Sequence, residues 1–128
     1  MSAMSDYLED AILDHILGTT AYTMPSAVYV GLSTASFNDD NSGVELTGNN
    51  YSRQAITFGA SSSSTASNNA AVDFPAATGS WGTVSHFGLF DASTGGNLLI
   101  HGALTTSKSV ATGDILRIAV GDMDITAA

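Results

Sequence analysis

Three histidines are the side chains of this chain best suited to proton transfer or metal binding near neutral pH. His86 and His101 lie on two segments that we expect to pair as a hairpin, where the two imidazoles could become neighbours and bind a metal ion. A protein metal site needs further ligands, and the sequence shows no evident third residue. His15 lies near the end of an expected helix, where an imidazolium suits the negative end of the helix dipole. We therefore expect structural roles for these histidines, with metal binding by His86 and His101 kept as an alternative.

A second group of potential ligands lies between residues 39 and 45, where the chain is DDNSGVE. Carboxylate and amide oxygens are the ligands that Ca²⁺ prefers, but an EF-hand loop places its bidentate Glu about six residues after the glycine. Here Glu45 follows Gly43 much more closely. We expect a solvated turn, with a calcium site as the weaker alternative.

Enzymatic chemistry has little support in the sequence. The chain contains no cysteine, which excludes thiolate catalysis and Cys-ligated metal sites. It also lacks the G-x-S-x-G nucleophile elbow and the glycine-rich motifs G-x-x-x-x-G-K-S/T and G-x-G-x-x-G that bind nucleotides. We predict that the protein is not an enzyme and that it binds no cofactor.

The charge balance narrows the possible partners. Three Lys and Arg residues stand against 12 Asp and Glu residues, which gives a net charge of -9. Binding to nucleic acid or to an anionic membrane surface needs clustered basic residues, so neither is expected. No apolar run approaches the roughly 20 residues of a membrane span, and the N-terminus lacks the basic region of a signal peptide. We expect a protein made in the cytoplasm.

The first regular element should be a short amphipathic helix. Leu8, Ile12 and Ile16 recur at the i, i+4 and i+8 spacing of one helical face, which predicts a helix from Asp6 to Leu17. Ser5 or Asp6 can cap its first turn, and Gly18 can end it.

After Pro25 the hydrophobic period changes from that of a helix to that of strands. Alternation from Val28 to Ser33 predicts the first strand. A loop rich in Ser, Asn and Gly is expected between residues 59 and 70, and the DASTGG sequence predicts a hairpin turn at 91–96. The other expected strands are 51–58, 70–74, 81–90, 98–104, 115–120 and 123–125. This pattern indicates a mainly β fold, a small antiparallel β-sandwich or barrel with a short N-terminal α-helix.

We expect a single domain over residues 1–128, with an N-terminal arm and helix at 1–18 and a β-rich body at 26–128. In the hairpin of 81–90 with 98–104, strict alternation places Val84, His86 and Phe90 on one face and Trp81, Phe87 and Leu89 on the other. Both faces are apolar. We therefore expect a second sheet to cover one face, and the helix or a neighbouring subunit to cover the other.

Several blocks of the sequence resemble one family of proteins. They are SDYLEDAILDHILGTTAYTMPSAVYVGLSTA, YSRQAITFGA and WGTVSHFGLFDASTGGNLLIHGALTTSKSVATGD, in this order. They are similar to blocks of small virion proteins of tailed bacteriophages, which are often labelled tail fibre proteins. The resemblance implies a virion structural protein. The small size of such proteins looks more like that of capsid cement or decoration subunits, which commonly form trimers.

From the resemblance and the charge together we expect a capsid cement or decoration subunit. It would form a homotrimer on the outer surface of the head, bind the major capsid protein, and make no direct contact with DNA or a membrane. The absence of repeats or sustained heptads disfavours a long fibre, and the negative charge favours the outside of a DNA-filled shell. The alternative is a tail fibre or tail-tip protein that recognises the host through loops 36–50 and 61–71, where Phe37 and Tyr51 are the candidate exposed aromatics.

The expected contacts with partners combine the helix stripe with these loop aromatics. The candidate interface residues are Tyr7, Leu8, Ile12, Ile16, Phe37 and Tyr51. The stripe could equally pack on the sheet of its own chain. Ile12→Asp separates the two hypotheses, because it should unfold the chain only if the stripe belongs to the core.

Overall fold

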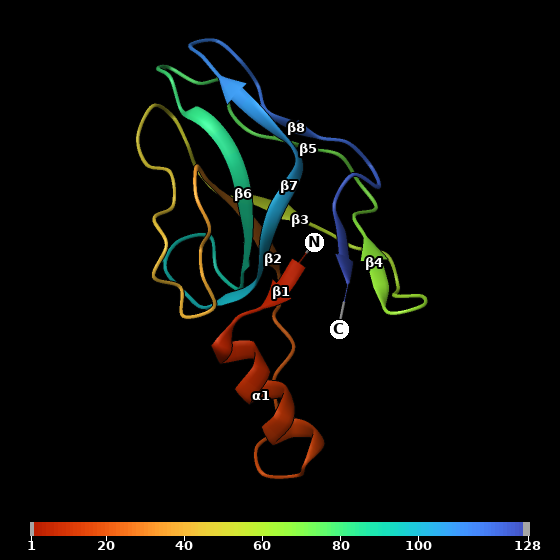
Figure 1. The fold of residues 1–128 in the computed structure, drawn as a ribbon. Coiled ribbons are helices and arrows are strands. Elements are labelled where there is room, and N and C mark those ends of the chain that lie inside the picture. The colour runs from red at the N-terminus through yellow and green to blue at the C-terminus, as the bar shows by residue number, and fades with distance from the viewer. Residues whose placement is uncertain (1, 127–128) are drawn as a thin grey trace.

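The computed structural model of the chain describes residues 2–126 (Figure 1). In these residues one helix and nine strands follow one another: β1 (Ser2–Met4), α1 (Asp6–Ile16), β2 (Val28–Ser33), β3 (Gln54–Ile56), β4 (Thr65–Ser67), β5 (Val72–Asp73), β6 (Gly82–Phe90), β7 (Leu98–Val110), β8 (Arg117–Ile118) and β9 (Asp124–Thr126). The prediction of a mainly β fold with one short N-terminal helix is confirmed. The strands predicted at 51–58 and 115–120 are shorter than expected, since only β3 and β8 form there.

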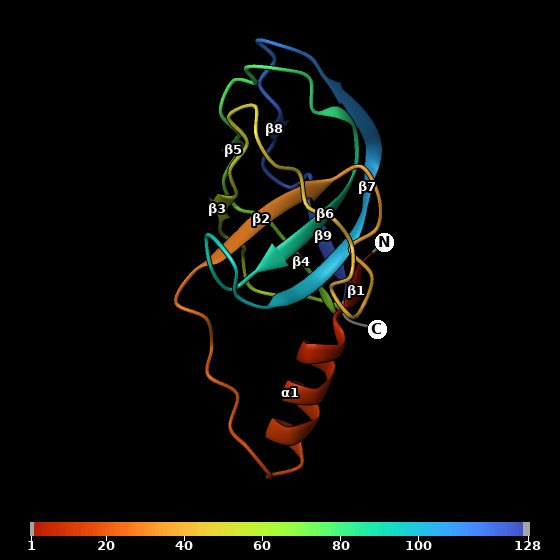
Figure 2. The ribbon, with the colours of Figure 1, turned by 90° about the vertical axis from the view of Figure 1, so that its left-hand side faces the viewer.

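The strands form one large sheet and two small ones, all with antiparallel pairing. The large sheet has the order β1-β7-β6-β2-β3, and the pairs β4-β9 and β5-β8 lie across from it (Figures 1 and 2). The long β6–β7 hairpin is the centre of the large sheet. Its turn is the predicted one, with Gly95 at φ 61° and Gly96 at φ 69°.

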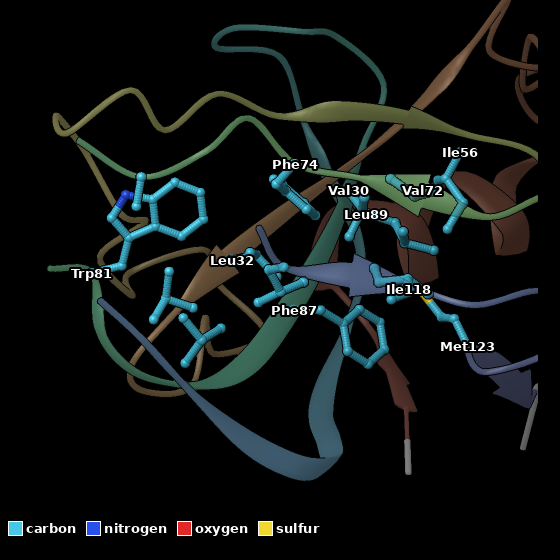
Figure 3. Packing of buried hydrophobic residues seen from close by; sticks show 14 residues of the cluster. Val30, Leu32, Ile56, Val72, Phe74, Trp81, Phe87, Leu89, Ile118 and Met123 are labelled. Atoms are coloured by element: carbon cyan, nitrogen blue, oxygen red, sulfur yellow. The ribbon is translucent and has the colours of Figure 1, made fainter. Parts of the chain in front are cut away.

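The main core lies between the large sheet and the layer opposite it. Figure 3 shows Val30, Leu32, Phe87 and Leu89 of the large sheet meeting residues such as Ile118 from the other layer. The whole cluster consists of Val30, Leu32, Ile56, Val72, Phe74, Ala77, Trp81, Val84, Phe87, Leu89, Val110, Leu116, Ile118 and Met123. Burial of so many large apolar side chains between two layers is the arrangement of a small sandwich.

The predicted division of the hairpin into two faces is wrong at Val84. This residue is fully buried in the main core with Phe87 and Leu89, and it does not share a face with Phe90. The pairing register shifts between Val84 and His86, because Val84 pairs with Lys108 whereas His86 pairs with Ala103. Such an irregularity breaks the strict alternation on which the prediction depended.

The outer face of the large sheet is covered around Phe90 and Leu98 by the chain's own loop, which the prediction of a helix or another subunit on this face did not include. Phe37, in the loop that follows β2, is 1% exposed and packs edge-on against Phe90, with ring centroids 5.6 Å apart. Gly88 leaves room for this contact, since a Cβ there would lie 3.2 Å from the Phe37 ring. Phe37, Phe90 and Leu98 form a second, smaller core.

The helix begins where the first strand ends, and it projects away from the sheet (Figure 1). Ser5 caps it as predicted, because its Oγ accepts a hydrogen bond from the Leu8 N–H at 3.2 Å and donates one to the Leu98 carbonyl. The Asp6 N–H donates to the Asp39 carbonyl at 2.8 Å, which joins the helix to the loop over the sheet. Gly18, at φ 81°, follows the end of the helix as expected.

The Ser/Asn/Gly segment expected as an exposed loop is only partly one. Residues 61–64 are exposed, but Thr65–Ser67 form β4 and Asn68 is 2% exposed. The Asn68 side chain donates to the carbonyls of Ala70 and Ala119 and accepts from the Met123 N–H. A buried amide with its hydrogen bonds satisfied therefore fixes this segment to the C-terminal part of the chain. Within residues 2–126, no helix is long and apolar enough to span a membrane.

Candidate functional site

The structure gives the two strand histidines separate positions and separate partners. His101 pairs with Gly88 and His86 pairs with Ala103, so the two imidazoles are not opposite each other. Each has a partner of its own: His86 Nδ1 lies 2.7 Å from Ser85 Oγ, and His101 Nε2 lies 2.6 Å from Asp39 Oδ1. Among the residues that the structure describes, no three His, Asp or Glu side chains gather closely enough to hold a metal ion.

The carboxylates of the acidic segment point to different partners. Asp39 contacts His101, Glu45 contacts Arg53, and Asp40 accepts a hydrogen bond from the Ser42 N–H at 3.0 Å. Hydrogen bonds from Ser42 lower the pKa of Asp40, which stays exposed. This is the turn predicted from the sequence, and the carboxylates do not converge on a common calcium position.

The most completely bonded polar group is an arginine cluster that we define as Glu45, Tyr51, Arg53 and Phe90. Arg53 Nη2 lies 2.8 Å from Glu45 Oε1, and Arg53 Nε lies 2.9 Å from Glu45 Oε2. The guanidinium lies 3.6 Å from the centre of the Phe90 ring, the geometry of a cation–π contact. The Arg53 side chain is 9% exposed and that of Glu45 is 22% exposed, so this ion pair is largely removed from water.

The arginine cluster connects three parts of the chain. Arg53 Nη1 donates to the carbonyls of Ala92 and Gly95 at 2.9 and 2.8 Å, which fixes the hairpin turn. The Tyr51 hydroxyl donates to Glu45 at 2.5 Å and accepts from the Leu32 N–H at 2.8 Å. Burial, and then the hydrogen bond to Glu45, raise the pKa of Tyr51.

Sequence reasoning missed this cluster as a unit. The available signal was the rarity of basic residues, since Arg53 is one of three Lys and Arg residues in the chain and lies within the strand predicted at 51–58. An arginine in such an acidic, sparsely charged protein is a strong candidate for a buried ion pair. The cluster bonds to the backbone of β2 and of the hairpin turn, so it stabilises the contact between these segments.

The predicted interface residues fall into three groups. Tyr7 and Ile16 are exposed, at 43% and 71%, and Ile12 is partly buried. Leu8 is only 7% exposed, so the first turn of the helix packs on the sheet of the same chain. The expectation that Phe37 is exposed is wrong, and Tyr51 is partly buried with its hydroxyl bonded to Glu45.

Large apolar side chains are exposed mainly on the helix and on the segment between α1 and β2, which we call the connector. We call this group the apolar arm; its members are Tyr7, Leu13, Ile16, Leu17 and Met24, and their exposed fractions range from 43% to 83%. The connector returns beside the helix (Figure 2). Its first residues bond back to the helix end, since the N–H groups of Thr19 and Thr20 donate to the Asp14 carbonyl and the Tyr22 N–H donates to His15 Nδ1.

An apolar groove lies beside the first turn of the helix, and we call it the basal groove. Its volume is about 250 Å³, and it is lined by side chains of the helix, the connector and the sheets, including Leu8, Tyr22, Pro25, Val28, Phe58 and Ile125. All ten lining residues are apolar or aromatic, and none is charged. Burial is the largest cause that raises the pKa of Tyr22, which lines the groove. The apolar arm and the basal groove are therefore the two surfaces of this chain best suited to contact another protein.

The two ends of the helix stripe should respond differently to substitution. Ile16→Asp should change the free energy of unfolding by less than about 0.5 kcal/mol, because Ile16 is mostly in water. Leu8→Ala should lower it by about 2 kcal/mol or more, because the substitution leaves a void against the sheet. Urea denaturation followed by circular dichroism measures both. A large loss at Ile16 would contradict the exposed position of the helix end.

Comparison with known proteins gives one result that covers almost the whole chain. A family model described as podophage GP4 fiber I protein gp80 matches residues 3–126. No curated protein matches the chain. The family match confirms the resemblance to phage virion structural proteins that the sequence blocks indicated. The description of the family also contains the fibre label. The chain belongs to the family of the podophage GP4 fiber I protein gp80.

Proposed function

We propose that this protein is a structural subunit of a fibre on the phage particle, and that it acts by joining other virion proteins without catalysis. The fibre description of its family supports this assignment over the capsid cement function that we favoured from the sequence. The observation that carries it is the apolar arm, because large apolar side chains exposed on a projecting helix are suited to permanent contact with another chain.

The dimensions of the elements indicate which part of a fibre the subunit could form. The 11-residue helix is about 16 Å long, and the 13-residue β7 spans about 45 Å at most. Neither element could serve alone as the shaft of a long fibre. In this proposal the subunit is a joint or a repeating segment, which gains its reach by attachment to further chains.

The second candidate function is that of a capsid cement protein. The net charge of -9 and the shortness of the helix and strands favour it. In that function the protein would form a homotrimer on the outer surface of the head and bind the major capsid protein. Neither function includes contact with DNA or a membrane, because the three basic residues of the chain are too few for a phosphate-binding surface.

Location and copy number on purified virions distinguish the two functions. A fibre subunit should be labelled by specific antibodies at discrete appendages, and quantitative mass spectrometry should find far fewer copies than of the major capsid protein. A cement subunit should be labelled over the whole head, with a copy number near that of the capsid protein. The second result would overturn the fibre proposal.

A further inference from the structure

Two of the three Lys and Arg residues in the chain line the same pocket. Lys108 and Arg117 are exposed, and both border a pocket of about 260 Å³ between β7 and the segment that runs from β8 towards β9. The third residue, Arg53, is 9% exposed and belongs to the arginine cluster. A protein with a net charge of -9 can hold an anion best where its exposed basic side chains gather, and that place is this pocket.

The charged groups of the pocket do not satisfy one another. Lys108 forms no ion pair within residues 2–126. Arg117 contacts Asp73 through Nη1 at 3.4 Å, but this pair is exposed to water, and the Nε and Nη2 groups make no hydrogen bond with the described part of the chain. Asp122 also lines the pocket and pairs with neither cation. A ligand with both an anionic group and hydrogen-bond donors would complement this set of charges.

An irregularity of β7 forms one wall of the pocket. In the pairing of β6 with β7, residues 104–107 lie opposite the single residue Ser85. Thr105 and Thr106 of this bulge are exposed and line the pocket. β1 pairs with β7 only as far as Gly102, and no strand within residues 2–126 pairs with that edge of β7 beyond it. Bulges re-aim side chains and are frequent beside functional sites, so the bulge is a second observation that indicates a binding site here.

The floor of the pocket is apolar and belongs to the main core. Ile118 and Met123, which lie beside each other in Figure 3, are 5% and 4% exposed. A second pocket of about 240 Å³ shares Met123, Thr105 and Asp122 with the first and continues to Asp124 in β9. We call the two adjoining pockets the polar groove. Each pocket is smaller than those that enclose a drug-sized ligand, so the groove suits a chain of small units, one unit to each pocket.

A sugar chain that carries a carboxylate has a group for each part of the polar groove. A carboxylate forms charge-assisted hydrogen bonds with a guanidinium and an ammonium group, which Arg117 and Lys108 provide. Ring hydroxyls can both donate and accept, so they can bond to the Thr105 hydroxyl and donate to the Asp122 carboxylate. The C–H face of a sugar ring can lie on the apolar floor.

Other anionic ligands match the polar groove less completely. A phosphate ion has no apolar face for the floor. An acidic side chain of a protein partner has no donor for Asp122, and the bulge at 104–107 interrupts the backbone ladder that an added peptide strand would use. Two cations are too few for the backbone of a nucleic acid.

We propose that the polar groove binds an acidic oligosaccharide, with a sugar carboxylate between Lys108 and Arg117 and with ring hydroxyls bonded to Thr105 and Asp122. This binding activity goes beyond the proposed joining of virion proteins and does not depend on where the subunit lies on the particle. The groove also lies outside the loops 36–50 and 61–71, from which the sequence predicted recognition of the host.

Titration of the isotope-labelled full chain, followed by amide NMR signals, tests the proposal. The acidic probes are trigalacturonic acid and sialyllactose, and their neutral counterparts are the methyl ester of the first and lactose. At least one acidic probe should shift the signals of residues 104–108 and 117–123 in a saturable manner, and its neutral counterpart should bind about tenfold more weakly or less. Absence of saturable shifts with both acidic probes, or equal binding of the neutral counterpart, would overturn the proposal.

Substitutions separate the contribution of charge from that of the hydroxyl group. Lys108→Gln should weaken binding of the acidic sugar by about fivefold or more. Ser93→Asp changes the net charge by the same amount in the hairpin turn at the other end of β7, and should alter binding by less than about twofold because water and salt screen distant charges. Thr105→Val should weaken binding by about threefold or more, whereas Thr112→Val, also exposed but outside the groove, should not. Equal effects of a substitution and its control would contradict the assigned site.

Two further probes distinguish the sugar from other sources of an anionic group. Triglutamate represents an acidic peptide, and inorganic phosphate represents a simple anion. Both should bind about tenfold more weakly than the acidic sugar, because neither brings ring hydroxyls to Thr105 and Asp122. Tighter binding of triglutamate would overturn the proposal in favour of an acidic protein segment. Equal binding of phosphate would overturn it in favour of a simple anion site.

Discussion

Arg53→Ala should lower the free energy of unfolding by about 3 kcal/mol or more, in the range found when one partner of a buried ion pair is removed. The substitution leaves the Glu45 carboxylate, 22% exposed, without its cation. It also removes the two hydrogen bonds that hold the carbonyls of Ala92 and Gly95 in the hairpin turn, and the cation–π contact with Phe90. Each loss acts on the outer face of the large sheet, so the effects should reinforce one another.

The chain contains a matched control for this prediction. Arg117 also pairs with a carboxylate, but its Nη1 lies 3.4 Å from Asp73 Oδ2, and the two side chains are 62% and 53% exposed. Water screens such a pair, and Arg117→Ala should change stability by less than about 1 kcal/mol. Urea denaturation at neutral pH measures both variants. Equal losses for Arg53→Ala and Arg117→Ala would show that the arginine cluster does not stabilise the fold.

The elements that could be predicted from the sequence are those that local chemistry defines. The helix from Asp6 carries its own cap at Ser5 and its own end at Gly18, and the β6–β7 turn needs the two positive φ angles of Gly95 and Gly96. Such signals lie within a few residues of the feature that they specify. These signals specify the helix ends and the turn independently of contacts with the rest of the chain.

The features that the sequence could not predict depend on pairing between distant segments. The register shift after Val84 follows from where β7 meets β6, and no local pattern in either strand specifies it. β4 is similar, because Thr65–Ser67 become a strand only by pairing with Asp124–Thr126 at the other end of the chain. A small-residue segment of low β propensity therefore looked like a loop until its partner was known.

The candidate site also combines features that the local sequence predicts with features that depend on contacts between distant segments. The period of the helix predicted that Leu8, Ile12 and Ile16 share a face, but not that the helix would leave the body after its first turn. The end of the stripe is exposed for this reason alone. The arginine cluster brings together residues from position 45 to position 90 and bonds to the Gly95 carbonyl. Its geometry depends on the close approach at Gly31, where a Cβ would lie 2.7 Å from Glu45 Oε2.

Phe37→Ala should lower the free energy of unfolding by about 3 kcal/mol or more, as is usual for the loss of a fully buried phenylalanine ring. Although Phe37 lies in a loop rich in polar residues, it is 1% exposed and packs against Phe90 over the outer face of the sheet. Removal of the ring leaves a void over Gly88 that neighbouring atoms can fill only in part. Thermal or urea denaturation measures the loss.

Val44→Ala is the control for this last substitution, because Val44 lies in the same loop but is 79% exposed and should contribute less than about 0.5 kcal/mol. The comparison separates two functions for the loop aromatic. If Phe37 recognised a host surface, Phe37→Ala would keep full stability and lose binding. Because the ring is instead part of the second core, its removal should also loosen the loop that carries Asp39 and Glu45, and with it the attachments of the helix start and of Arg53.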